Sequence, residues 1–276
     1  MPTEPFRVTV RRASLIGNLS RRVLGLVQPA ASIGSPLRVV RRYAAPEAKQ
    51  GVAVDAQFFY AIDDAAVGKY EKKTGQRVGG WKSDGKDRIT HLDSGVVFGN
   101  RLYCAHSNYP NTPMVSSVEI FDMARMTHFE SVSLPHLGSA TWVDRADGTW
   151  WVTFAHYAGA GGERGKTPAD TTLVQFDDRW QQLRAWSFPP AVIQRWEGMS
   201  SSGGVWVGRS LYTTGHHARE LYVLELPASG SVLALRAIIP FESEGQGIAI
   251  DRDARLLYSI QRRTREVLVS ELPALR

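Results

Sequence analysis

The chain has 276 residues, 43% of them hydrophobic and 22% charged, a balance typical of folded globular proteins and not of disordered or fibrous ones. Its net charge of +6 lies entirely in residues 1–48, which hold eight arginines and two glutamates, so the rest of the chain gives no support to a nucleic-acid-binding face. No apolar run reaches 18 residues, which excludes a membrane-spanning helix, and the single cysteine, Cys104, excludes a disulfide framework and a cysteine-based zinc site.

Residues 1–34 are rich in arginine and contain one acidic residue. Ser20 to Leu24 read Ser-Arg-Arg-Val-Leu, which resembles a twin-arginine export signal, and a short apolar run and small residues follow. Two interpretations stay open at this point: a leader of a protein exported to the periplasm, or a disordered segment in front of a cytoplasmic one. Both place residues 1–34 outside the fold and predict a single domain over residues 35–276.

From residue 37 onward the sequence repeats itself. Leu37–Asp55 and Leu233–Asp251 both read as a strand, a polar loop, and then Gln-Gly with a short apolar strand that ends in Asp. Short β-branched and aromatic runs recur between polar turns, about four strands in every 45 residues, which is the pattern of propeller blades. The innermost strand of each blade is expected to begin near Gly51, Gly95, Ser139, Gly203 and Gly247. The sequence therefore predicts an all-β, five-bladed β-propeller.

The two ends of the repeat region complement each other. The last unit stops after its third strand, at Leu272, while the strand Leu37–Tyr43 has no blade of its own and matches the fourth strand Leu233–Ile239. We expect the N-terminal strand to pair into the last blade and close the ring, which removes an open sheet edge. The only helix predicted is a short one over Pro189–Trp196, with proline in its first turn.

Three motifs carry a resemblance to known repeats: Gln-Gly-Val-Ala-Val-Asp at 50–55, Phe-Tyr-Ala-Ile-Asp at 59–63 and Tyr-Glu-Lys-Lys-Thr-Gly-Gln-Arg-Val at 70–78. With them, residues 37–272 resemble the propeller superfamily that includes NHL and YVTN-type repeats. The resemblance implies the fold and leaves the function open, because members of that superfamily include lactonases, lyases, cycloisomerases and binding scaffolds.

Six of the seven histidines are expected on one face of the propeller. His106, His156 and His216 each follow the second strand of their blades, and these three blades are adjacent. Imidazole is well suited to bind a divalent metal or to transfer protons near neutral pH. The spacing predicts that the three converge near the channel axis and hold a divalent metal, with zinc first and calcium, magnesium or iron not excluded.

Other polar residues are expected around this channel mouth. Glu244 and His91 are the predicted general acid and base, and Asp93 is expected on the same face. The predicted substrate-binding residues are Gln50, Asp63, Ser94, Asn108, Tyr109, Tyr157, Gln246 and Gln261.

One motif resembles a nucleotide-binding loop but lacks the helix that such a loop requires. Residues 160–167 fit a permissive form of the phosphate-binding P-loop, but Pro168 and a strand follow where that motif needs a helix. The sequence therefore predicts no nucleotide cofactor.

These features predict a monomeric propeller enzyme that acts on a small polar molecule, with neither a nucleic-acid partner nor a membrane span. Metal-assisted hydrolysis of a lactone or ester, or lyase or cycloisomerase chemistry, would suit the groups available. The alternative is a non-catalytic scaffold that binds a peptide or protein on the same face. Buried, convergent histidines favour the enzyme, and splayed, solvated ones favour the scaffold.

Overall fold

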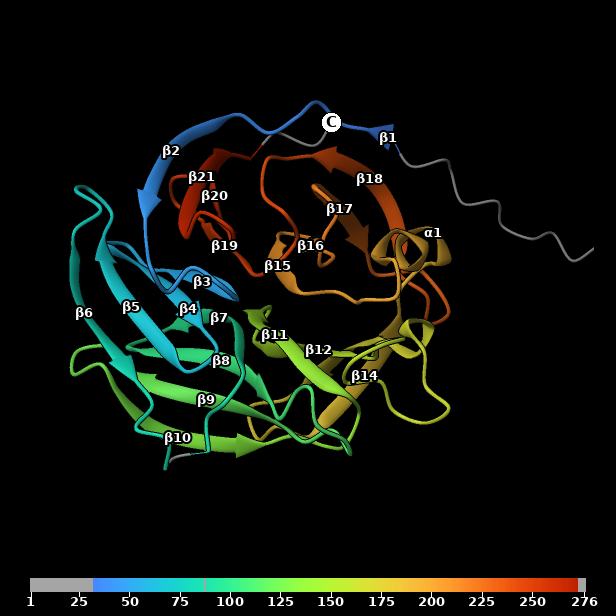
Figure 1. The fold of residues 1–276 in the computed structure, drawn as a ribbon. Helices are drawn as coiled ribbons and strands as arrows, with labels where there is room; N and C mark the ends of the chain where they lie inside the picture. Colours follow the sequence, from blue (N-terminus) through green and yellow to red (C-terminus); the bar gives the residue numbers. More distant parts are fainter. Residues whose placement is uncertain (1–31, 87, 273–276) are drawn as a thin grey trace, which may run out of the picture.

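The computed structural model describes residues 32–86 and 88–272, and Figure 1 shows them as a ring of blades around a central axis. All five blades are antiparallel four-stranded sheets, and one of them carries an additional short strand at its outer edge. The prediction of a five-bladed β-propeller is confirmed. The leader expected for residues 1–31 lies outside the described residues.

Within each blade the strands follow one another in chain order from the axis outward, except where the N-terminus closes the ring. Blade one contains β3 (Gly51–Val54), β4 (Phe58–Asp63), β5 (Ala66–Glu71) and β6 (Arg77–Lys82). Blade two contains β7 (Leu92–Phe98), β8 (Arg101–Ser107), β9 (Ser116–Asp122) and β10 (Thr127–Ser133). Blade three contains β11 (Ser139–Ala146), β12 (Thr149–Ala155), β13 (Thr172–Phe176) and β14 (Gln182–Ser187). Blade four contains β15 (Gly203–Val207), β16 (Ser210–Thr214), β17 (Glu220–Glu225) and β18 (Ala234–Pro240). Blade five contains β19 (Ile248–Asp251), β20 (Leu256–Gln261), β21 (Glu266–Glu271) and the N-terminal β2 (Val39–Ala44).

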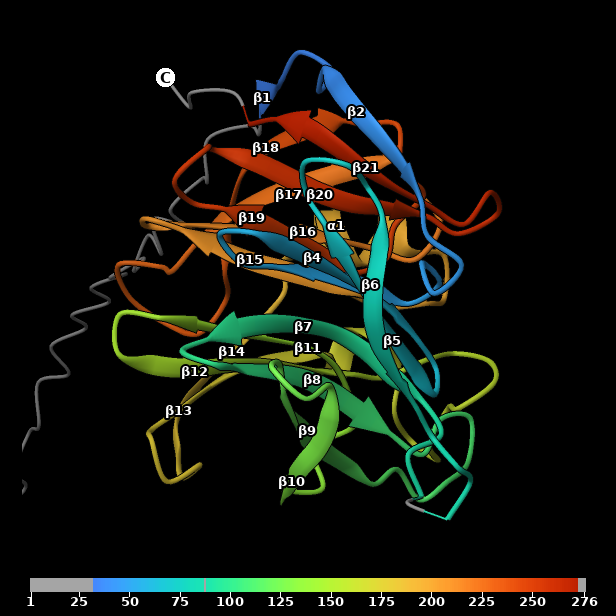
Figure 2. The ribbon, with the colours of Figure 1, turned by 90° about the vertical axis from the view of Figure 1, so that its left-hand side faces the viewer.

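The ring closes as the sequence predicts. Strand β2 pairs antiparallel with β21, from Val39 opposite Ser270 to Ala44 opposite Glu266, and so supplies the outer strand of blade five. In Figures 1 and 2 the N-terminal strands run across the outer edges of the last two blades.

The chain joins the propeller earlier than the boundary expected at residue 35. Strand β1 (Ser32–Ile33) pairs in parallel with β18, and the backbone N–H of Gly34 donates to the carbonyl of Ile238 at 2.9 Å. The expectation that residues 32–34 lie outside the fold is therefore wrong. The physical reason is that the outer edge of blade four has free backbone groups, and the segment that leads to β2 passes along that edge.

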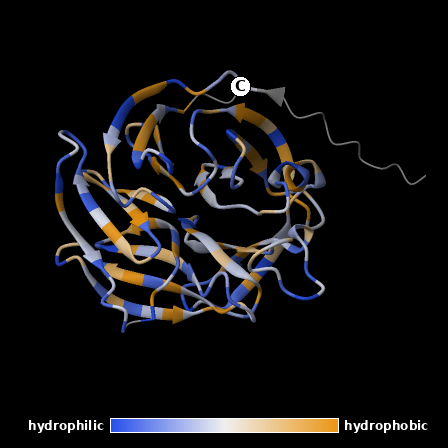
Figure 3. Cartoon of the chain, in the orientation of Figure 1, coloured by the Kyte–Doolittle hydropathy of each residue, from blue (hydrophilic) through white to orange (hydrophobic). Residues whose placement is uncertain are grey.

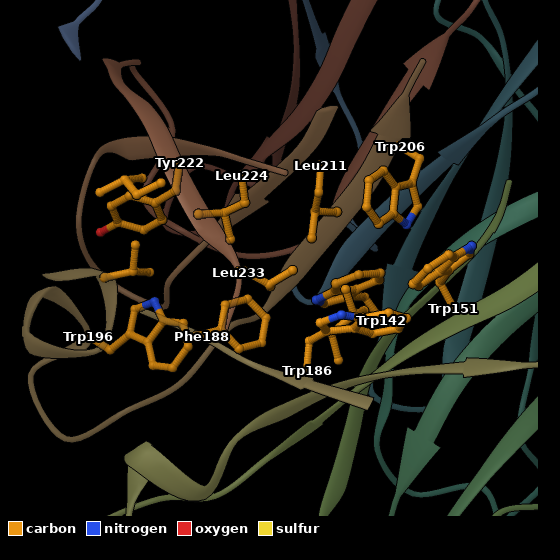
Figure 4. Close-up of a cluster of buried hydrophobic side chains, with 13 residues drawn as sticks. Trp142, Trp151, Trp186, Phe188, Trp196, Trp206, Leu211, Tyr222, Leu224 and Leu233 are labelled. Atoms are coloured by element: carbon orange, nitrogen blue, oxygen red, sulfur yellow. The ribbon is translucent and has the colours of Figure 1, made fainter. Parts of the chain in front are cut away.

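The hydrophobic core has one large cluster in each seam between neighbouring blades. A small further cluster contains Met114, Ala155 and Tyr157. Figure 3 shows hydrophobic residues along the strands and hydrophilic ones in many of the connecting loops. The seam between blades three and four is rich in tryptophan, and Figure 4 shows Trp142, Trp151 and Trp206 grouped there. Because every blade packs on two neighbours, the seams hold the innermost strands at a set distance from the axis.

Within residues 32–86 and 88–272, helical structure is limited to short pieces in the long connections of blade three. The predicted helix forms as α1 (Pro190–Ile193) followed by the 3-10 turn η2 (Gln194–Trp196), and its Trp196 is buried in the seam between blades three and four. A second 3-10 turn, η1, spans Pro168–Asp170. No helix in the described part of the chain has the length and apolarity needed to cross a membrane.

Candidate functional site

A cavity of about 220 Å³ opens at the channel mouth on the face where the histidines were expected. The loops that enter the innermost strands and the loops that leave the second strands surround it. Six residues predicted from the sequence line it: Gln50, His91, Tyr109, Tyr157, His216 and Gln246. Five others line it as well: Asp93, Thr141, Met199, Ser202 and Arg262.

The His91 imidazole lies between two carboxylates. Its Nδ1 is 3.0 Å from Oδ1 of Asp64, and its Nε2 is 3.6 Å from Oδ2 of Asp93. Asp64 also accepts hydrogen bonds from Lys49 and Gln50. Burial opposes the ionisation of Asp64, but the hydrogen bonds from His91, Lys49 and Gln50 outweigh it and hold its pKa well below the ordinary value. Asp64 is therefore a permanent anion that orients the ring of His91.

Asp93 is the titratable carboxyl of the site. Its residue is only 4% exposed, and burial raises its pKa from the ordinary 3.8 to about 7, although the nearby positive groups His91 and Arg262 oppose the rise. Burial lowers the pKa of His91, but the hydrogen bond to Asp64 and the charge of Asp93 more than compensate, so the net shift is upward. Near neutral pH this pair can hold or release a proton at little free-energy cost.

Two β-bulges place side chains in the cavity. The pairing of β7 with β8 shifts between Leu92 and Gly95, and Asp93 lies in this irregular stretch. The pairing of β11 with β12 shifts between Ala140 and Trp142, which leaves Thr141 as the extra residue. A bulge changes the direction of side chains locally and is common beside functional sites. The Thr141 hydroxyl is buried and has no hydrogen-bond partner within the described residues.

On another side of the cavity, Arg262 donates from Nη1 to Nε2 of His216 at 3.3 Å. The other ring nitrogen of His216, Nδ1, then donates to Nε2 of His217 at 3.0 Å. Burial, followed by the charges of His217 and Arg262, lowers the pKa of His216 to about 4. His216 is therefore a neutral acceptor near pH 7.

Tyrosines and two long loops form the remaining wall. The Tyr109 ring lies 5.0 Å from the His91 ring and 5.2 Å from the Tyr157 ring, measured between ring centres. Gly161 has a φ of +74°, and a Cβ atom there would come within 2.5 Å of Tyr109, so glycine is needed for the loop to approach this ring. The backbone N–H of Met114 donates to Glu163 at 2.9 Å and joins the two loops above the tyrosines.

The three histidines predicted to bind a metal do not converge. His106 lies beside Ser117 and Glu119 of its own blade, and Nδ1 of His156 is 3.5 Å from Glu163. No group of three or more His, Cys, Asp or Glu suited to a metal ion exists within residues 32–86 and 88–272. The prediction of convergence is wrong because His106 still belongs to strand β8 and His156 directly follows β12, where side chains face neighbouring strands and loops instead of the axis.

The predicted general acid or base Glu244 also lies outside the cavity. Its carboxylate pairs with Arg263 at 3.0 Å and approaches Arg219 at 3.9 Å. The structure thus brings His91 into the cavity but not Glu244.

Four predicted substrate-binding residues do not line the cavity. Asp63 pairs with Lys49 and Arg265. Asn108 accepts a hydrogen bond from the Val115 backbone within its own loop. The Gln261 side chain accepts a weak hydrogen bond of 3.4 Å from the Glu244 backbone. Ser94 is buried at the channel axis.

Five site residues lie at a regular offset from the end of a strand, and sequence reasoning missed two of them. Each blade contributes to the site one residue that lies one or two positions beyond the end of its second strand: Asp64, Tyr109, Tyr157, His216 and Arg262. Sequence reasoning selected Asp63 and Gln261, which are the last residues of β4 and β20, and so missed their successors Asp64 and Arg262. Counting from the strand ends would have found them, whereas the role of Thr141 depends on a bulge that has no clear sequence signal.

Comparison with solved structures identifies the fold. The glutaminyl cyclase of Myxococcus xanthus superimposes with a TM-score of 0.59 and 10% identity, covering 89% of this chain and all of that one. The hydrazine synthase of Kuenenia stuttgartiensis gives a TM-score of 0.50 and 11% identity over 80% of this chain and 83% of that one. The fold is that of a β-propeller.

The similarity to these solved structures concerns the fold alone. No protein-family model matches the chain, and no curated protein sequence matches it. At 10–11% identity the solved structures do not show which reaction or ligand belongs to this propeller.

Proposed function

We propose that this protein is an enzyme that performs general acid–base catalysis on a small polar molecule in the channel-mouth cavity. The observation that carries the proposal is Asp93, a buried carboxyl that lines the cavity beside His91 and has its pKa raised to about 7. A catalytic acid or base works best when its pKa is close to the working pH, and burial is a usual way to reach that value.

The geometry gives each of the three residues a role. Asp64 accepts a hydrogen bond from Nδ1 of His91, which leaves Nε2 facing Asp93. Ionised Asp93 removes a proton from the substrate or from a water molecule, and the Asp93 carboxyl so formed returns it to the leaving group or to an adjacent atom. The imidazolium of His91 steadies the negative charge of Asp93 while the carboxyl is ionised. Hydrolysis of a lactone or ester and lyase or cycloisomerase reactions all need such a transfer.

No step in this mechanism passes through a metal, because His106, His156 and His216 are too dispersed to form one ligand set. The monomeric state expected from the sequence stays a prediction. The small volume and the buried charges favour a small ligand over a peptide or protein bound as on a scaffold.

The test is a turnover assay with lactones, esters, hydroxy acids and peptides with an N-terminal glutamine, the last because one similar propeller is a glutaminyl cyclase. For any substrate that is turned over, Asp93→Asn should lower kcat by roughly a hundredfold or more. The matched control is Glu130→Gln, an exposed acid on β10, which should leave kcat unchanged. An unchanged kcat in Asp93→Asn would refute the assignment, and binding of a peptide without turnover would favour the scaffold.

A further inference from the structure

The Arg262 guanidinium lines the cavity without an acidic partner. Its side-chain hydrogen bond is to His216, which is neutral near pH 7, and no carboxylate of the described chain forms an ion pair with it. Its neighbours on the same loop differ: Arg263 pairs with Glu244 at 3.0 Å and Arg265 pairs with Asp63 at 3.1 Å. The arginine that lines the cavity is therefore the one that forms no close ion pair with a carboxylate of the described residues, although its charge acts on Asp93 from a distance.

The other charged groups at the cavity are already paired. Asp64 is held by Lys49 and His91, and Asp93 is next to His91. A guanidinium that lines a small cavity and has no ion-paired carboxylate is suited to bind an anion, and its planar pair of N–H groups matches a carboxylate. A phosphate dianion fits less well, because Asp93 in the lining and Asp64 beside His91 would repel its second charge.

A second group without a partner faces the same space. Thr141 lines the cavity, is 2% exposed, and its Oγ1 makes no hydrogen bond within the described residues. Leaving such a hydroxyl without a hydrogen bond is unfavourable, and a ligand group could supply the missing partner. Thr141 belongs to blade three and Arg262 to blade five, so the two approach the cavity from different sides of the ring.

We infer that the substrate is a small carboxylate with a second polar group, a hydroxyl or carbonyl, such that Arg262 binds the carboxylate and Thr141 hydrogen-bonds the second group. Asp93 of blade two lines the same cavity. The inference rests on the proposed function only in calling the ligand a substrate, because its binding can be measured without turnover.

The experiment is titration calorimetry of the full chain with four probes: lactate, lactamide, propionate and inorganic phosphate. Lactate carries both groups, lactamide lacks the carboxylate charge, and propionate lacks the hydroxyl. Lactate should bind best, lactamide roughly ten- to hundredfold more weakly, and propionate roughly tenfold more weakly. Phosphate binding as tight as that of lactate would overturn the choice of a carboxylate.

Paired variants separate the two contacts. Arg262→Gln should weaken lactate roughly ten- to hundredfold, whereas the control Arg263→Gln, whose arginine is paired outside the cavity, should not. Thr141→Val should reduce the affinity for lactate to that for propionate and leave the affinity for propionate unchanged. Thr141→Ser keeps the hydroxyl and should bind lactate as the natural chain does. Thermal melting of each variant shows whether it folds.

The outcomes distinguish this inference from the proposed function. Asp93→Asn should still bind lactate, so loss of turnover with retained binding supports both proposals. Binding that depends on Arg262 in a protein without any turnover would support the carboxylate site and refute the enzyme. Lactate binding that is absent at tens of millimolar, or that is equal in Arg262→Gln, would overturn the inference.

Discussion

Ser94 of blade two touches Gly247 of blade five across the channel axis: a Cβ atom added to Gly247 would lie 2.7 Å from both Cβ and Oγ of Ser94. Gly51 of blade one is also close to Gly247, since the added Cβ atom would lie 2.6 Å from the Cα of Gly51. The innermost strands therefore meet below the cavity and form its floor. A separate cavity of about 260 Å³ at the opposite mouth is lined by the far ends of the same strands, including Val54 and Asp251.

This contact predicts a strong effect of one methyl group. Gly247→Ala should destabilise the protein by about 1–3 kcal/mol, because backbone and a buried serine would have to move apart. The matched control is Gly159→Ala, where an added Cβ meets nothing within 4 Å and the φ is not in the left-handed region. Urea unfolding measures both, and equal stability of the two variants would contradict the close packing at the axis.

Asp93 predicts a pH-dependent gain in stability on substitution. Its pKa is raised in the folded state, so its contribution to stability is fully present below the ordinary value of 3.8 and is lost as the pH rises through about 7. Asparagine imitates the protonated form without the ionisation. Asp93→Asn should therefore raise Tm relative to the natural chain by an amount that grows from about pH 4 to pH 7 and then levels off. A Tm difference that is constant with pH would contradict the raised pKa.

Gln246 has a φ of +129°, a backbone conformation that residues other than glycine rarely adopt. Its amide donates only a weak hydrogen bond of 3.4 Å to the carbonyl of His216. Gln246→Gly removes both the strain and the amide, and Gln246→Ala removes only the amide. We expect the glycine variant to be about 1 kcal/mol more stable than the alanine variant, after allowance for the entropy of glycine. The reverse order in urea unfolding would show that the backbone is not strained.

The N-terminal strands predict a graded response to truncation. Removing residues 1–31 keeps every described contact and should leave Tm nearly unchanged. Removing residues 1–36 also deletes β1 and its pairing with β18, and should lower Tm by a few degrees. Removing residues 1–44 deletes β2 and exposes the edge of β21, so aggregation or loss of cooperative melting is expected. Three identical melting curves would refute the closure.

The separation of the histidines predicts that no bound zinc depends on His156. His156→Ala should leave the zinc content of the purified protein unchanged, as measured by elemental analysis, because its imidazole lies near Glu163 and away from His106 and His216. Zinc present in equal amount to the chain, and lost in this variant, would instead restore the metal-site hypothesis.

The amino-acid sequence by itself determined the blades. Strand length, turn residues and the repeated Gln-Gly motif are local properties, and they predicted five blades, the short helix after Pro189 and the pairing of β2 with β21. The face that carries the site was also predictable, because the order of strands in a blade decides at which end each loop emerges. His91, Tyr109, Tyr157 and the three other predicted residues that line the cavity needed only this rule to be placed on that face.

Only the tertiary structure decided which side chains meet. A side chain in a strand changes direction with every residue, so an error of one position exchanges Asp63 for Asp64 and Gln261 for Arg262. The bulges that place Asp93 and Thr141 in the cavity depend on how two strands pair, which no single segment encodes. The raised pKa of Asp93 and the hydrogen bond of Arg262 to His216 likewise depend on groups from different blades, and these are brought together only when the ring closes.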